Sequence, residues 1–182
     1  MELENLGGLN PEPISGFTTT MYYALRSDFE TVAEPPAFET VGGYATKAKC
    51  VGEHVFKTGK FFNTIEIVPE TGKIDTTPIG EKKHKLSQNA FTAQISGSED
   101  KVLGFMRMVK NADFIALVQE NSGNMRQFGS QLLRAWFDSL AHTGEEAVEG
   151  NNSCTFTLMD KQKWPAPIYT GDIVIAAAPI GG

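Results

Sequence analysis

The run Phe114-Ile-Ala-Leu-Val118 is followed by the polar stretch Glu120-Asn-Ser-Gly-Asn124 and then by Met125-Arg-Gln-Phe128. Asn and Gly supply the positive φ angles that a tight turn between antiparallel strands requires. We therefore expect residues 114–118 and 125–128 to pair as a β-hairpin. Apolar runs later in the chain predict further strands at residues 131–137, 153–159 and 169–175.

Two stretches upstream alternate between apolar and polar residues. In residues 61–68, Ile65 and Ile67 share one face, and Glu66 falls on the other. In residues 86–95, Gln94 lies opposite a similar apolar face. A period of two is the signature of a strand with one buried and one wet face.

The rest of the first half predicts strands separated by a long loop. Residues 18–25 are rich in β-branched and aromatic residues and indicate a first strand, a second is expected from Tyr44, and two more flank residues 57–60. Pro35-Pro36 lack backbone donors, so residues 27–43 are expected to form a loop. Residues 1–16, rich in Gly, Pro and Glu, are interpreted as an N-terminal arm, and residues 17–182 as a single domain.

One helix is expected, over about residues 99–110. Ser98 is a candidate N-cap and Asn111 a candidate left-handed stop. The apolar residues of this segment share one helical face and favour core packing over a cofactor site: Val102, Phe105, Met106 and Val109. The predicted fold is mainly β, an antiparallel sandwich or barrel with one flanking α-helix.

Charge and hydropathy limit the function classes. The chain has 182 residues, a net charge of -6 and one basic cluster, Lys82-Lys-His-Lys85, which is interpreted as a solvated strand end rather than a nucleic-acid patch. Binding to nucleic acid through phosphates depends on clustered Lys and Arg, so that class is disfavoured. The longest apolar run, residues 173–178, is far shorter than the ~20 residues of a membrane-spanning helix. With no signal pattern at the N-terminus, we expect no membrane partner and synthesis and use in the cytoplasm.

No catalytic constellation is recognised. None of the three histidines, His54, His84 and His142, has a second ligand at metal-binding spacing. No phosphate-binding loop or nucleophile elbow occurs. The sequence therefore predicts no catalytic residue, no metal and no cofactor.

The acidic and sulfur-containing residues support the same prediction. Glu145, Glu146 and Glu149 fall in a polar loop with nothing apolar nearby to raise a carboxyl pKa. Cys50 and Cys154 lie in strand-like surroundings and are expected to be small buried hydrophobes rather than a disulfide.

Four aromatic residues are candidate anchors of the core or of an interface. Phe62 and Trp136 lie in expected strands, and Trp136 suits either role. Phe29 and Phe38 lie in the expected loop, which together with the arm lacks the periodicity needed to fold onto its own core. We therefore expect both segments to become ordered against neighbouring subunits.

Several short motifs, taken in order, resemble a known family. They are Phe56-Lys-Thr-Gly-Lys-Phe-Phe62, Thr71-Gly-Lys-Ile74, Gly80-Glu81, Leu103-Gly-Phe105, Asn111 before the strand at 114–118, and Pro165-Ala-Pro-Ile-Tyr-Thr-Gly171. This pattern resembles the tail tube-like virion proteins of tailed bacteriophages, particularly those of Bacteroidetes phages and prophages, whose fold is similar to that of the type VI secretion tube protein.

The resemblance implies a β-sandwich or barrel that assembles into hexameric rings, and the rings stack into the conduit for DNA ejection. The protein would then be made in the bacterial cytoplasm and reside in the virion tail. Its partners would be other copies of itself, other tail proteins and phage DNA that passes without specific binding. The family offers no catalytic residues to transfer.

In such a tube, Glu66 and Gln94 are candidate lumen-facing residues, because the wet face of the main sheet would form the channel. Two alternatives stay open. The chain could be a tail terminator, a head-to-tail connector or another tail component of the same fold. It could also be an enzyme or ligand-binding module on a β-barrel, which a pocket lined by His54 or His84 would support.

Overall fold

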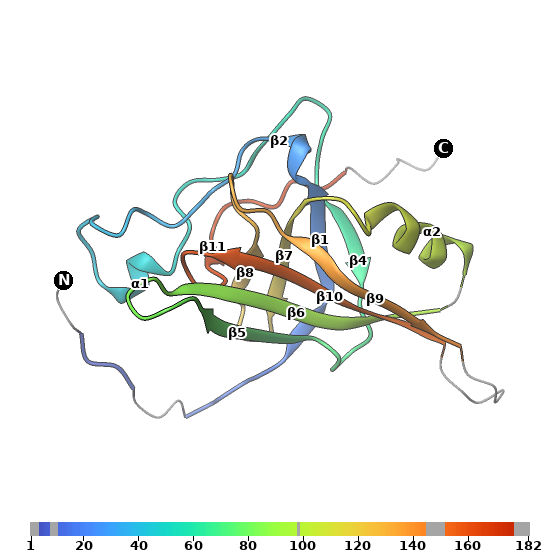
Figure 1. Cartoon of the computed structure of the whole chain (residues 1–182), viewed down its shortest axis with the longest axis horizontal. Helices are drawn as coiled ribbons and strands as arrows, with labels where there is room; N and C mark the ends of the chain where they lie inside the picture. Colours follow the sequence, from blue (N-terminus) through green and yellow to red (C-terminus); the bar gives the residue numbers. More distant parts are fainter. Residues whose placement is uncertain (1–3, 8–10, 98, 145–151, 177–182) are drawn as a thin grey trace.

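The computed structural model describes residues 4–7, 11–97, 99–144 and 152–176 as a β-sandwich of two main antiparallel sheets. One sheet has five strands in the order β11-β8-β7-β1-β4, and the other has four in the order β5-β6-β10-β9. A short pair, β2-β3, forms a third sheet. Figure 1 shows the two main sheets one behind the other with their strands running in different directions, and α2 at the end beside β4.

The elements have the following bounds. The five-stranded sheet contains β1 (Phe17–Leu25), β4 (Asn63–Glu66), β7 (Phe114–Glu120), β8 (Met125–Phe128) and β11 (Ile168–Tyr169). The four-stranded sheet contains β5 (Lys73–Ile79), β6 (Leu86–Ser96), β9 (Trp136–Thr143) and β10 (Ser153–Gln162). The remaining elements are β2 (Phe29–Thr31), β3 (Val55–Phe56), a 3-10 turn (Arg26–Asp28), α1 (Tyr44–Lys47) and α2 (Asp100–Val109).

The main core lies between the two sheets and is rich in phenylalanine. The Phe137 ring packs edge-on against Phe156, with ring centroids 5.6 Å apart, and Phe91 and Phe128 are fully buried beside them. Phe105 of α2 adds a further edge-on contact to Phe137 at 5.5 Å. The helix therefore closes one end of the sandwich through its apolar face.

A second core covers the opposite face of the five-stranded sheet. Phe29 and Phe62 are buried there with Ile115 and Leu117 of β7. Since residues 114–118 are buried whichever way they point, β7 is covered on both faces. A strand covered on both faces reads as a continuous apolar run, which is the pattern of Phe114–Val118.

The predicted fold class, the hairpin and the helix are confirmed. In the β7–β8 hairpin, the Glu120 N–H donates to the Asn124 carbonyl at 2.9 Å, and Gly123 takes a positive φ of 94°. Helix α2 spans residues 100–109 and buries Val109, with Val102, Phe105 and Met106 half-buried on the same face. The C-cap is Lys110, and Asn111 does not have the left-handed φ expected of it. The N-cap expected at Ser98 lies outside the described residues.

The strand expected from Tyr44 is wrong, because residues 44–47 form helix α1. The Glu4 carboxylate accepts a hydrogen bond from the Tyr44 N–H at 3.2 Å, and the Lys47 ammonium donates to the carbonyl of Phe38 at 2.9 Å. These two side chains satisfy backbone groups around the short helix that the local sequence pattern does not reveal.

The strand expected at residues 131–137 is also wrong for most of its length, since β9 begins only at Trp136. The Ser130 hydroxyl accepts from the Leu133 N–H and donates to the Leu133 carbonyl, both at 3.1 Å, and so forms a turn. Ala135 then bridges to Phe114 of β7 before the chain crosses to the other sheet. Local side-chain hydrogen bonding has replaced the ladder that apolar content predicted.

Near the C-terminus, β11 is shorter than the strand expected at residues 169–175 and covers only Ile168–Tyr169. The Tyr169 hydroxyl donates to the Asp172 carbonyl at 3.0 Å, which folds the chain back around Gly171. The sequence interpretation also missed β5, whose residues are mostly exposed and include Pro78. Proline is tolerated on an edge strand, and β5 is one.

The loop expected at residues 27–43 folds in part onto its own domain, so the prediction that it becomes ordered mainly against neighbours is wrong for its first residues. Phe29 is 2% exposed and Val32 4% exposed, and β2 pairs with β3. Phe38, in contrast, is 75% exposed. In the arm, residues 4–7 and 11–16 are exposed, as expected of a segment outside both sheets.

Candidate functional site

The outer surface of the four-stranded sheet is a regular polar surface. Along β10 the core residues alternate with half-buried Thr155 and Thr157, and along β6 with Thr92 and Gln94. We call this surface the polar face. It carries Lys73, Asp75, Thr77, Gln88, Ala90, Thr92, Gln94, Trp136, Ser139, Ala141, Thr143, Ser153, Thr155, Thr157, Met159 and Lys161.

Hydroxyl and amide groups dominate the chemistry of the polar face. The Thr92 and Thr157 hydroxyls lie 3.0 Å apart and share a hydrogen bond across β6 and β10. Lys73 and Asp75 form an exposed ion pair at 2.9 Å. Lys161 is the other charged residue of the polar face, and Asp138, at the bulge of β9 beside this face, accepts a hydrogen bond from Trp136. With Asp138 included, two lysines and two aspartates cancel. Its character is that of a neutral, hydrogen-bonding surface.

Both edges of the four-stranded sheet are open in the described chain. β5 pairs only with β6, and β9 pairs only with β10. An edge strand presents a row of unpaired N–H and C=O groups that another strand can complete. The polar face therefore ends on each side at a strand that a neighbouring molecule could extend.

The structure separates the two residues predicted to face a lumen. Gln94 is half-buried on the polar face in β6, whereas Glu66 is exposed in β4 of the other sheet. The strands approach each other just beyond Glu66, where the Val68 N–H donates to the Gln94 carbonyl at 2.8 Å. The two side chains nevertheless leave from different sheets.

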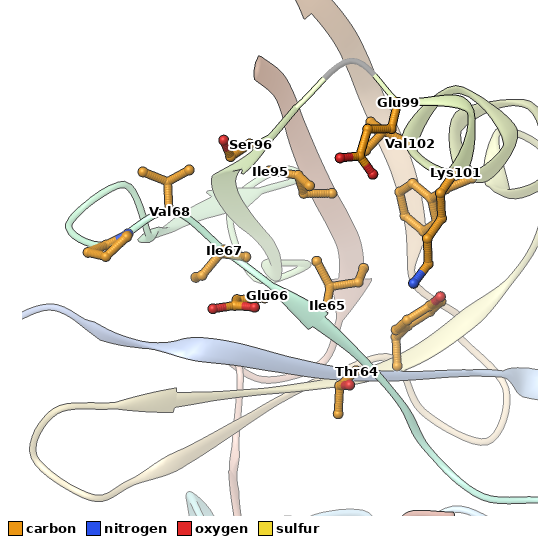
Figure 2. Close-up of a pocket in the computed structure, with 13 residues that line it drawn as sticks. Thr64, Ile65, Glu66, Ile67, Val68, Ile95, Ser96, Glu99, Lys101 and Val102 are labelled. Carbon is orange, nitrogen blue, oxygen red and sulfur yellow. The ribbon is translucent and has the colours of Figure 1, made fainter. Parts of the chain in front are cut away.

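Glu66 instead lies beside a groove of about 650 Å³ between β4, β6 and α2. Figure 2 shows Ile65, Ile67 and Ile95 gathered around this groove, with Val102 contributed by α2. Glu66, Glu99 and Lys101 supply the charged groups. The remaining lining residues are Tyr23, Thr64, Val68, Pro69, Ser96 and Phe105. Neither His54 nor His84 lines it.

The four candidate anchors have three different environments. Phe62 is 1% exposed and, like Phe29, belongs to the second core. Trp136 is half-buried on the polar face, at the first residue of β9. Its indole N–H donates to Asp138 at 3.2 Å. Phe38 is exposed. Of the four, only Trp136 and Phe38 present substantial surface to a partner.

His54 is buried in the second core as a neutral ring. Its Nδ1 accepts from the Ala33 N–H at 3.1 Å, and the ring stacks on Tyr169 with centroids 4.2 Å apart. Burial lowers the pKa of His54 to about 4. The neutral form fits this environment because burial disfavours the charged form.

The thiols are also shifted by burial. Burial, and then the charge of Glu34, raises the pKa of Cys50 to about 12, and its Sγ donates to Gln127 Oε1 at 3.3 Å. Burial raises the pKa of Cys154 as well. Both cysteines are free, and the direction of these shifts is opposite to that of an activated thiolate.

Sequence interpretation missed a buried carboxyl group. Asp160, in β10, accepts from Asn89 Nδ2 at 2.8 Å and from the Gly129 N–H at 2.7 Å. Burial raises the pKa of Asp160 to about 6. The sequence pattern could have revealed this burial, because Asp160 continues the alternation of the buried residues Cys154, Phe156 and Leu158. Its hydrogen bonds join β10 to β6 and to the end of β8 within the sandwich.

In residues 4–7, 11–97, 99–144 and 152–176, no group of three or more His, Cys, Asp or Glu residues is placed to hold a metal ion. The acidic residues Glu145, Glu146 and Glu149 lie outside those ranges. No helix within the same ranges is both long and apolar enough to cross a membrane. No protein-family model, curated protein or solved structure matches the chain.

Proposed function

We propose that this protein is a structural virion protein, a phage tail tube subunit that forms stacked rings, with six subunits as the expected ring number. The observation that carries the proposal is the polar face of the four-stranded sheet, bounded on both sides by open edge strands. A catalytic module needs reactive groups brought together in a cleft. A tube needs a regular surface that neighbours can continue.

The open edges favour assembly through the four-stranded sheet. If β5 of one subunit approaches β9 of the next, the interface is head-to-tail and the sheet continues from subunit to subunit. A head-to-tail contact that closes into a ring leaves no free edge for aggregation. Pro78 in β5 and the bulge between Thr157 and Leu158, where β9 pairs with β10, restrict which groups are available for this contact.

The charge of the polar face suits passage of DNA. Its two lysines are balanced by Asp75 and by Asp138 at the adjoining bulge of β9, and most of its other side chains are neutral and polar. Affinity for duplex DNA comes from excess Lys and Arg that release counterions. A channel lined by this surface, in a chain of net charge -6, lets DNA slide without binding tightly.

Negative-stain electron microscopy of the purified chain, with light scattering on the same sample, tests this proposal. A tube subunit gives rings that stack into hollow filaments as protein concentration rises. Single rings that never stack would favour the tail terminator or connector role. A monodisperse monomer at every concentration and salt condition would contradict both.

A further inference from the structure

The four-stranded sheet has two ends, which the register of its two longest strands, β6 and β10, defines. Ser96 lies opposite Ser153 at one end. Ser87 lies opposite Gln162 at the other end, and the turn from β5 to β6 lies just beyond it. Helix α2 follows β6 beyond Ser96. Figure 1 shows the β5–β6 turn at the left of the molecule and α2 at the right, so the two ends face in opposite directions.

The end at the β5–β6 turn concentrates positive charge, and we call it the basic end. The turn is held in shape, because the Lys85 ammonium donates to the Gly80 carbonyl at 2.5 Å and the His84 N–H donates to the Glu81 carbonyl at 3.0 Å. Like charges held close together repel, and a partner of opposite charge relieves that repulsion. Five lysines and one glutamate are exposed at this end, with a formal sum of +4: Lys82, Lys83, Lys85, Lys161, Lys163 and Glu81.

The end beside α2 has the opposite charge, and we call it the acidic end. The Val68 N–H donates to the Gln94 carbonyl at 2.8 Å, which brings the turn between β4 and β5 beside the end of β6. Figure 2 shows the start of α2 at the same end, across the groove from β4. Lys73, at the start of β5, is already paired with Asp75. The exposed charges that β4, the turn and the start of α2 contribute sum to -3: Glu66, Glu70, Glu99, Asp100 and Lys101.

The two ends are too far apart to neutralise each other within one molecule. Strand β10 has 10 residues, and at ~3.3 Å per residue it spans roughly 30 Å. Attraction between exposed charges is screened over ~8–10 Å at ordinary salt concentrations. The charges of the two ends therefore act on other molecules. A second copy of this chain presents both complementary surfaces, whereas a DNA duplex would be attracted by one end and repelled by the other.

We propose that the basic end of one copy docks on the acidic end of a second copy, so that copies associate head to tail along the strand direction. Because the contact joins two different surfaces, it can repeat from copy to copy. Pairing through the β5 and β9 edges acts at right angles to the strands, so both contacts can form in one assembly. Assigning the head-to-tail contact to the stacking of rings rests on the proposed function, whereas the contact itself does not.

Charge reversal at each end tests the contact. The basic-end variant reverses three lysines: Lys82→Glu, Lys83→Glu and Lys163→Glu. The acidic-end variant reverses three glutamates: Glu66→Lys, Glu70→Lys and Glu99→Lys. Each reversal changes the charge by two, so the basic end goes from +4 to -2 and the acidic end from -3 to +3. All six side chains are exposed and make no hydrogen bond or ion pair within the described residues, so the fold should be retained.

Sedimentation and light scattering measure the association of each form. Association of the wild type should weaken at least ~10-fold as salt rises from ~0.05 to ~0.5 M. Each variant alone should associate at least ~10-fold more weakly than the wild type, because its two ends carry like charge. An equimolar mixture should recover association, because the reversed lysines of one variant meet the reversed glutamates of the other.

The control carries Lys57→Glu, Thr58→Glu and Lys60→Glu. It adds nearly as much negative charge as the basic-end variant, but in the turn after β3, outside the four-stranded sheet. This control should associate as the wild type does. Equal loss of association in the control and in the basic-end variant would overturn the proposal, because the effect would then come from net charge alone.

Three further outcomes would overturn the contact: a wild type that never self-associates, variants that associate as the wild type does, and a mixture that does not recover. Loss of duplex DNA binding in the basic-end variant, with self-association unchanged, would assign the basic end to DNA instead. Electron microscopy separates this inference from the proposed function. Rings that never stack would overturn the inference alone, whereas head-to-tail filaments without rings would support it and contradict the tube.

Discussion

The two main sheets differ in how they are covered. The five-stranded sheet is buried on both faces at its centre, where all of Phe114–Val118 are inaccessible. The four-stranded sheet has one buried and one polar face, and its long strand β10 alternates along its length. Figure 1 shows loops and short elements packed around the first sheet, while β5, β6 and β10 run uncovered across the front.

This difference separates the stabilising part of the molecule from the part that we expect to function. A strand buried on both faces contributes free energy of unfolding but offers no surface to a partner. A strand with a wet face contributes less burial and keeps that surface available. Substitutions in the two sheets should therefore separate loss of folding from loss of assembly.

The largest expected effect is on the second core, at Phe62. Phe62→Ala removes a ring that packs against Phe56 and Phe29, with centroids 5.0 and 5.6 Å away. The free energy of unfolding should fall by about 3–5 kcal/mol, because a large buried side chain leaves a cavity. Denaturant titration measures it. Phe61→Ala, at a position 37% exposed, is the control and should cost clearly less.

A second prediction for the covered sheet concerns pH. Burial lowers the pKa of His54 from 6.5 to about 4, so the unfolded chain binds a proton more readily than the folded chain. This contribution to stability is present above about pH 6.5 and is lost as the pH falls toward 4, on the order of 3 kcal/mol in total.

Denaturant titrations of wild type and His54→Phe, run across this pH range, measure the effect. Phenylalanine keeps a ring against Tyr169 but cannot titrate. The wild type should lose stability relative to the variant as the pH falls. A difference that does not change with pH would show that His54 is not buried in its neutral form.

Asp160, on the buried face of the four-stranded sheet, should make stability depend on pH in the opposite direction to His54. Burial raises the pKa of Asp160 from 3.8 to about 6, so here the folded chain binds the proton more readily. Its contribution is present below about pH 3.8 and is lost as the pH rises through 6, on the order of 2–3 kcal/mol. The difference between wild type and Asp160→Asn isolates this group. If wild type gained stability over the variant as the pH rose from 4 to 6, the sign would be wrong.

The sequence correctly predicted the elements that are determined by residues close together along the chain. The period of two in residues 86–95 identified β6, and the turn at Glu120-Asn-Ser-Gly-Asn124 identified the β7–β8 hairpin. The helical stripe from Val102 to Val109 identified α2 and its buried face. In each case local periodicity and tertiary burial agree.

The failures involve contacts between residues far apart in sequence. Helix α1 is capped by Glu4, about forty residues away, and no local pattern contains that contact. Phe29 was predicted to need a neighbouring subunit, yet Phe56 and Phe62 of the same chain cover it. For the candidate site, alternation placed Glu66 and Gln94 on wet faces but could not show that those faces belong to different sheets. Register and sheet order come from nonlocal pairing, which a one-dimensional pattern does not encode.

The smallest expected effect on folding, and the most informative for function, comes from placing a lysine on each sheet, which changes the charge by +1 at Gln94 and by +2 at Glu66. Gln94→Lys on the polar face and Glu66→Lys on β4 should each change the free energy of unfolding by no more than about 0.5 kcal/mol, since neither side chain is buried. Their effects on assembled particles should differ. If the four-stranded sheet lines a channel, particles of the Gln94→Lys variant should retain duplex DNA, and added salt should release it, because a ring repeats the new charge around the lumen.

Glu66→Lys is the comparison on the other sheet, since it also places a lysine on an exposed strand but does so beside the groove. Nuclease protection of DNA incubated with each assembled variant, measured across a salt series, distinguishes the two surfaces. Protection by Gln94→Lys alone assigns the lumen to the polar face and removes Glu66 from it. Protection by Glu66→Lys alone would reverse the assignment and place the five-stranded sheet toward the DNA. Protection by neither, in particles that assemble normally, would contradict a DNA conduit lined by either sheet.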